Sequence, residues 1–243
     1  SSTGLNTLLP SWALAGGLDS IKARVNEPAM RRRMVKEMVA TLKRRKQKHF
    51  TYAVVAYYDA DTTLNGKNIE EINLLKGRKH KAETEAETIM EMAVKGGASM
   101  VFHGMGDWDV ENIMRYPQNM FASDASIRVY NFGVPHPRGY GTNARVLGYY
   151  VRQRKVIPLE EAIRRMTSLP AQKFKLTGRG LLQSSMVADV LVFDENTIID
   201  ASTYERPHQY SRGMKYVVVN GQLVVDGEKH LGVRSGKVLR MGE

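Results

Sequence analysis

The chain contains no cysteine among its 243 residues. This absence excludes disulfides, thiolate nucleophiles and cysteine-ligated metal sites within the chain. Long apolar runs are also lacking, because the longest one, residues 52–58, is far below the roughly 20 residues that cross a bilayer. The first residues carry neither the basic start nor the long apolar centre of a secretory signal. We therefore expect no membrane span, no export and a cytoplasmic location.

The composition predicts a folded protein with a basic surface. Hydrophobic residues make up 42% of the chain and charged residues 25%, and the net charge is +11, so a sizeable core is expected. Basic residues gather in residues 31–48, where apolar residues recur with the period of an amphipathic helix. A solvated helix face explains this charge, and an anionic partner is the alternative. The segment has no interleaved aromatics and no zinc-finger spacing, so we do not expect nucleic acid as a partner.

Local patterns predict a mixed α/β chain. Helices are expected near residue 21, with Asp19 or Ser20 as cap, and from Pro28, 69–75, 83–95, 108–116, 142–154 and 159–167. Strands are expected at 51–58, 98–105, 119–122 and 187–193. Residues 97–124 then read as a strand, a short helix and a strand, the βαβ unit of a parallel sheet. Asn220-Gly221 predicts a hairpin within residues 216–225.

Asp124 is the first candidate site residue. It lies just after the strand predicted at residues 119–122, and α/β folds gather catalytic side chains at the carboxyl ends of their strands. The alternative is a carboxylate that caps a helix or closes a turn.

His136 and Arg138 form a second candidate site, because two prolines fix the backbone around one imidazole and one guanidinium. This arrangement suits the binding of a substrate carboxylate, and a rigid surface loop is the alternative. His103, inside a predicted strand, is expected to be a core residue rather than a ligand. The other histidines, His49, His80, His208 and His230, lie in polar or basic surroundings and give no site signal.

Several motifs resemble those of one enzyme family. They are Phe121-Ala122-Ser123-Asp124, Pro135-His136-Pro137-Arg138, Gly141-Thr142 with Arg145-Val146-Leu147-Gly148, and residues 188–194. In order and spacing they are similar to the N-acyl-D-amino-acid deacylases (D-aminoacylases) of the amidohydrolase superfamily. The resemblance extends to residues 100–105 and 219–221, and residues 2–10 resemble the segment that follows the sixth barrel strand. It therefore covers nearly the whole chain.

The resemblance implies the C-terminal part of a metal-dependent (β/α)8 TIM-like barrel, with an inserted small α/β segment and a small β-sandwich domain. Residues 1–97 would hold a barrel segment and the inserted α/β subdomain. Residues 98–177 would hold the last barrel strands and helices, with the seventh strand at 98–105 and the eighth at 119–124. Residues 178–243 would form the β-sandwich portion and the C-terminal tail.

The resemblance also implies roles for individual residues. Asp124 would be the catalytic aspartate at the metal centre, both a metal ligand and the group that shuttles the proton of the hydrolytic water. Arg138 would contact the substrate carboxylate. Phe102 and Met105 would line the acyl or side-chain pocket, and Ser2 would approach the substrate.

The chain departs from the family pattern in its metal ligands. It has no H-x-H pair, and only 123 residues precede Asp124, whereas a complete barrel needs about 250 residues. It also begins at Ser1 without a methionine. We therefore expect the C-terminal subunit or fragment of a heteromeric enzyme, with the other metal ligands on an N-terminal polypeptide.

The expected activity is hydrolysis of the amide bond of N-acyl-D-amino acids or a related amide, with a divalent metal, expected to be zinc, as cofactor. A cyclic amide or imide hydrolase on the same fold is one alternative, because Ala125 replaces the glycine more usual after the catalytic aspartate of D-aminoacylases. A non-catalytic interaction subunit is another, and the basic helix is the feature that favours it.

Overall fold

A computed structural model describes residues 2–240, except for the side chain of Ser2. The chain divides into two compact units, and it passes between them more than once. The first unit comprises residues 1–104 and 129–136, and the second comprises 105–128 and 137–243. Asp124 and Arg138 thus belong to the second unit, while the segment between them includes eight residues of the first.

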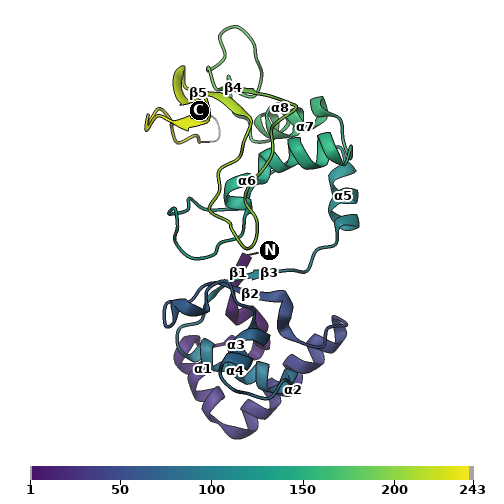
Figure 1. Cartoon of the computed structure of the whole chain (residues 1–243), viewed down its shortest axis with the longest axis vertical. Helices are drawn as coiled ribbons and strands as arrows, with labels where there is room; N and C mark the ends of the chain where they lie inside the picture. Colours follow the sequence, from purple (N-terminus) through teal and green to yellow (C-terminus); the bar gives the residue numbers. More distant parts are fainter. Residues whose placement is uncertain (1, 241–243) are drawn as a thin grey trace. The chain divides into compact units, whose positions relative to one another are not determined.

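The first unit is built from helices and a small sheet. Its elements are β1 (Ser2–Gly4), η1 (Leu5–Leu8), η2 (Ser11–Leu14), α1 (Gly17–Asn26), α2 (Pro28–Arg44), η3 (Phe50–Tyr52), β2 (Ala53–Tyr57), η4 (Thr62–Leu64), α3 (Ile69–Leu75), α4 (Ala82–Val94) and β3 (Ser99–Phe102). Figure 1 shows α1 to α4 packed together on one side of the sheet. None of the described helices is long and apolar enough to cross a membrane.

Helix α2 confirms the amphipathic pattern. Pro28 stands in its first turn, where a missing backbone N–H costs nothing, and the side chain of Glu27 caps it by accepting from two backbone N–H groups. Its buried residues are Met34, Met38, Val39 and Leu42. On the basic face, Arg33 Nε lies 2.8 Å from Glu37 Oε1, so part of this charge is neutralised within the unit. Helix α1 differs from expectation, because Gly16, with φ of +86°, is its cap.

The sheet of the first unit has the order β1-β3-β2, and both pairs are antiparallel. β3 is therefore the central strand and the βαβ prediction is wrong. Residues 119–124, predicted as a parallel strand, form no strand in the described chain. The N–H of Phe121 bonds instead to the carbonyl of Arg165 at 3.4 Å. An apolar run becomes a strand only where a neighbouring strand pairs with it, and no described strand pairs with these residues.

The second unit combines helices with a separate sheet. Its elements are α5 (Asp107–Arg115), α6 (Arg138–Arg145), the π-helical η5 (Val146–Gln153), α7 (Leu159–Met166), α8 (Ser168–Lys173), β4 (Val190–Phe193), β5 (Met214–Val219), β6 (Gln222–Asp226) and β7 (Lys229–His230). Its core joins Met114 of α5, Ala144 of α6, Leu147 of η5, Ala162 of α7 and Ile198 of the loop after β4.

The sheet of the second unit is antiparallel with the order β4-β5-β6-β7. The hairpin at Asn220-Gly221 is confirmed: both residues have positive φ, +47° and +77°, as a type I′ turn requires. A β-sandwich needs a second sheet packed against the first. The sandwich, the barrel and the three-part division of the chain therefore stay predictions.

Candidate functional site

Asp124 adopts an unusual backbone conformation. Its φ is +48°, in the left-handed region that few residues other than glycine enter, although aspartate tolerates it better than most. The side chain is 87% exposed, so its carboxylate is open to an incoming molecule. Residues held in sparsely populated backbone regions cluster at active sites. The conformation therefore agrees with a functional role for Asp124.

Arg138 supplies the positive charge beside Asp124. Its Nη2 lies 3.0 Å from Asp124 Oδ2, and the side chain of Arg138 is only 19% exposed. Arg138 is the first residue of α6, and the preceding Pro137 acts as the helix cap, accepting from the N–H groups of Tyr140 and Gly141. The structure thus brings together the two residues that the motifs single out separately.

Close packing fixes the start of α6 beside the loop that carries Asp124. A Cβ atom on Gly139 would lie 3.3 Å from Arg128 Cγ and 3.7 Å from Ala125 Cβ. Farther along the helix, a Cβ atom on Gly141 would lie only 2.5 Å from the Cβ of Asp200. Glycine at both positions lets the backbone approach its neighbours closely, which holds Arg138 near Asp124.

The other predicted substrate-binding residues are distributed over both units. Met105 lies in the second unit and is 66% exposed. Phe102 and His136 belong to the first unit, where both are half-buried. The ring centroids of Phe102 and Tyr52 are 6.0 Å apart. The side chain of Ser2 lies outside the described part of the chain. The substrate-binding roles of these residues stay predictions.

His103 was expected in the core, and this prediction is wrong. β3 ends at Phe102, and His103 follows it as an exposed residue whose backbone N–H bonds to the carbonyl of Tyr52 at 2.8 Å. The strand was predicted to run to residue 105, which would have turned His103 inward. Because β3 ends at Phe102, the alternation of side chains along a strand no longer turns His103 toward the core.

Asp124 alone does not make a metal cage. A carboxylate oxygen is a suitable ligand for zinc, which usually takes three or four protein ligands. Among the described residues, however, the group of His, Asp and Glu side chains that converges closely enough to hold an ion does not include Asp124. Asp124 is therefore not part of a preassembled group of three or more ligands among the described residues.

That converging group consists of His49, Glu70, His80 and Glu85, all in the first unit. No sequence motif pointed to this group, because the two histidines are 31 residues apart and neither lies in a metal-binding motif. Only the packing of α3 and α4 brings the four side chains together.

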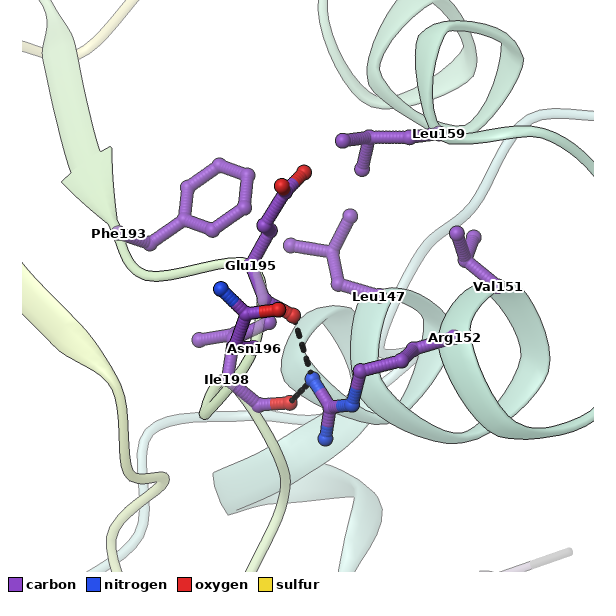
Figure 2. A pocket seen from close by; sticks show the side chains of 8 residues that line it. All are labelled: Leu147, Val151, Arg152, Leu159, Phe193, Glu195, Asn196 and Ile198. Carbon is purple, nitrogen blue, oxygen red and sulfur yellow. Dashed lines mark hydrogen bonds between the residues drawn. The ribbon is translucent and has the colours of Figure 1, made fainter.

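A shallow pocket in the second unit holds none of the predicted site residues. Figure 2 shows its apolar wall, formed by Leu147, Val151, Leu159 and Phe193. Arg152 reaches across it and donates from Nη1 to two backbone carbonyls, those of Glu195 and Ile198, both at 2.7 Å. These two hydrogen bonds connect η5 to the loop after β4. We therefore assign the pocket a structural role.

Comparisons with known proteins place the chain in a family. The model of the amidohydrolase family matches residues 32–225. A D-aminoacylase of Alcaligenes xylosoxydans xylosoxydans is 34% identical over 176 residues, which are 72% of this chain and 34% of that protein. An N-acyl-D-aspartate deacylase of the same organism is 38% identical over 146 residues, 60% of this chain and 29% of that protein. The chain thus spans about a third of the length of these curated relatives.

Solved structures agree with the sequence relatives. A crystal structure of D-aminoacylase matches with a TM-score of 0.69 and 32% identity, covering 77% of this chain and 37% of that one. An N-acyl-D-glutamate deacylase of Bordetella bronchiseptica, solved with zinc and a phosphonate inhibitor, matches with a TM-score of 0.66 and 32% identity, covering 82% and 39%. The resemblance inferred from the motifs is confirmed, and the chain belongs to the amidohydrolase family.

Proposed function

We propose that this chain is the C-terminal portion of a metal-dependent amidohydrolase that cleaves the amide bond of N-acyl-D-amino acids. The observation that carries the proposal is the Asp124–Arg138 pair: an exposed carboxylate lies within 3.0 Å of a largely buried guanidinium, within the segment that matches the family. The relatives named for a substrate act on N-acyl-D-aspartate and N-acyl-D-glutamate. Their substrates carry a carboxylate beside the scissile amide.

Asp124 would act as the general base and then as the general acid. Its carboxylate accepts the proton of the attacking water and returns it to the leaving nitrogen, so one residue serves both halves of the reaction. Exposure of the side chain leaves room for water and substrate at its oxygens. Asp124 would also be this chain's ligand to a divalent metal, zinc, which supplies Lewis-acid polarisation of the scissile carbonyl when bound.

Arg138 would bind the carboxylate of the amino-acid part. A guanidinium offers a planar fork that matches a carboxylate with two parallel hydrogen bonds. In the chain alone this fork faces Asp124. The substrate carboxylate would share or replace that contact, which would hold the scissile amide close to Asp124. His136, Phe102, Met105 and Ser2 are proposed to complete substrate binding.

The active form would contain a second polypeptide or a further segment. The chain covers about a third of its relatives, and Asp124 belongs to no group of three or more potential metal ligands among the described residues. The remaining two thirds of a D-aminoacylase would supply the rest of the barrel and the other ligands. We propose that this chain forms the end of the barrel, the inserted α/β segment and part of the β-sandwich.

The test is to co-produce this chain with a polypeptide that corresponds to the missing two thirds of its relatives. The purified complex is assayed for bound metal and for hydrolysis of matched N-acyl-D- and N-acyl-L-amino acids and of cyclic amides and imides. We expect zinc in the complex and a preference for the N-acyl-D-amino acids. A preference for cyclic substrates would indicate the alternative hydrolase. A complex that assembles but hydrolyses none of these amides would indicate an interaction subunit.

A further inference from the structure

The first unit contains a group of four potential ligands that the proposed reaction does not use. His49 precedes η3, Glu70 lies in α3, His80 lies between α3 and α4, and Glu85 lies in α4. One atom of each side chain lies within 4.8 Å of those of the others. Asp124 is not a member and lies in the other unit.

The negative charge of this group is energetically unfavourable because one of its two glutamates is buried. Glu85 has a fully buried side chain, and an uncompensated ionised carboxylate in such surroundings is strongly unfavourable. One of its oxygens accepts the N–H of Phe50 at 2.8 Å, and the other lies 2.5 Å from His49 Nδ1. Glu70 contacts His80 Nε2 through its Oε1, which also lies 3.6 Å from His49 Nδ1. Among the described residues, the ion-pair partners of both glutamates are these two histidines.

Two protonated histidines would be a poor source of the missing positive charge. The rings of His49 and His80 are stacked, with centroids 4.1 Å apart and planes 20° from parallel. Two imidazolium ions at this separation would repel each other. A single divalent cation between the rings and the glutamates would balance two carboxylates while both imidazoles stay neutral.

The donor set selects the kind of cation. Two imidazole nitrogens and two carboxylate oxygens do not suit calcium or magnesium, which prefer oxygen ligands throughout. Imidazole suits zinc, and four protein ligands without an open position are typical of a structural zinc site. Ligands about 2.0–2.2 Å from a tetrahedral zinc lie about 3.3–3.6 Å from one another. The four atoms, already within 4.8 Å of one another, need only small side-chain movements, and the exposed His80 is free to make them on its loop.

We propose that His49, Glu70, His80 and Glu85 form a structural zinc site in the first unit. The bound ion would tie the segment before η3 and the α3–α4 loop to the buried end of α4. These elements are joined through non-local packing, and closing such loops with a metal stabilises a fold. The site is independent of the proposed catalytic metal, because none of its ligands is Asp124 or a neighbour of it in sequence.

The test is a zinc titration of the chelator-treated full chain, followed by competition with a chromogenic chelator and by the absorption of bound cobalt. Circular dichroism is recorded in parallel, so that folding induced by zinc counts as binding. We expect one equivalent of zinc and a rise of the unfolding midpoint with zinc concentration. His80→Ala should weaken zinc binding about tenfold or more, because one of four ligands is lost, and Glu70→Gln should do the same.

Two matched variants serve as controls. His230→Ala removes an exposed histidine of the second unit, and Asp124→Asn removes the proposed catalytic ligand. Both should bind zinc as tightly as the unchanged chain. The site is overturned if the folded unchanged chain binds no zinc, if His80→Ala and Glu70→Gln bind it equally tightly, or if Asp124→Asn is the variant that loses it. None of these results depends on whether the chain takes part in amide hydrolysis.

Discussion

Arg138 Nη2 lies 3.0 Å from Asp124 Oδ2, so the proposed carboxylate-binding residue is the ionic partner of the proposed acid/base. Because the Asp124 side chain is 87% exposed, this pair adds little to folding stability; exposed ion pairs contribute about 0–1 kcal/mol. A catalytic role for the pair is the proposal that the next two variants test. Replacing either residue should separate a role in activity from a role in folding, because activity and stability should respond differently.

Asp124→Asn should abolish most activity of the active complex and leave its folding intact. The amide keeps the shape of the side chain but cannot accept the proton, and general acid/base groups contribute about 10²–10⁴ in rate. The measurement is kcat together with the thermal unfolding midpoint. Asp226→Asn, at an exposed position of β6, is the matched control and should be active. A kcat for Asp124→Asn within about twofold of the parent would be incompatible with a general acid/base worth 10² or more.

Arg138→Lys should impair binding of substrates that carry a carboxylate. Lysine keeps the charge but lacks the planar fork that makes two parallel hydrogen bonds. KM should rise much more for an N-acyl-D-amino acid than for its ester or amide, because only the first presents a carboxylate. Equal increases for the charged and the neutral substrates would remove carboxylate recognition from Arg138.

Glu161 gives the second unit a specific sensitivity to acid. Hydrogen bonds from Arg164 and Arg165 lower the pKa of the Glu161 carboxyl from 4.5 to about 2. Because the folded-state pKa is depressed, the ionised carboxylate stabilises the fold above about pH 4.5, and this contribution is lost as the pH falls towards 2. The side chain of Arg165 is 3% exposed, so it depends on this partner.

Glu161→Gln should therefore lower the unfolding midpoint at pH 7, and the difference from the unchanged chain should shrink as the pH falls below 4.5. Thermal unfolding followed by circular dichroism between pH 7 and pH 3 measures this. Glu160→Gln, at the exposed position before it on α7, is the control and should follow the unchanged chain. A difference that stays constant over this range would refute the linkage.

Gly148→Ala should destabilise the second unit. A Cβ atom on Gly148 would lie 2.3 Å from the carbonyl oxygen of Ile198 and 3.0 Å from Ile199 Cα, so backbone would have to move. Overpacking of this kind costs about 1–3 kcal/mol. Denaturant unfolding should detect the loss. Gly236→Ala, where a Cβ would meet nothing within 4 Å, makes the same chemical change and should be close to neutral.

Features set by local sequence were predictable. The periodic apolar residues of α3 predicted its bounds, residues 69–75, and Asn220-Gly221 predicted the hairpin of β5 and β6, because both depend on residues a few positions apart. The strand predicted from the local pattern at 119–122 was wrong, because a strand also needs partner strands, which no local pattern specifies. Asp124 and Arg138 were identified singly from motifs, whereas their contact depends on an irregular loop that sequence patterns do not describe.

The group formed by His49, Glu70, His80 and Glu85 could not be predicted from local sequence patterns either. Glu85 is 36 residues from His49, and Glu85 looked like one of several acids in the first turns of an ordinary helix. Its complete burial, which gives it chemical interest, results from the packing of α4 against other helices. No periodicity or spacing rule separates such a glutamate from its exposed neighbour Glu83.

The return of the chain to the first unit for residues 129–136 constrains how that unit could be truncated. There the N–H of Val134 bonds to the carbonyl of Ala56 at 2.7 Å, and the Phe132 ring lies 4.5 Å from that of Tyr57. A fragment that ended at Gly104 would lack residues 129–136, and Ala56 and Tyr57 of β2 would lose these two contacts. The natural boundary for an isolated first unit is therefore after His136, and such a fragment would necessarily carry Asp124 with it while leaving Arg138 behind.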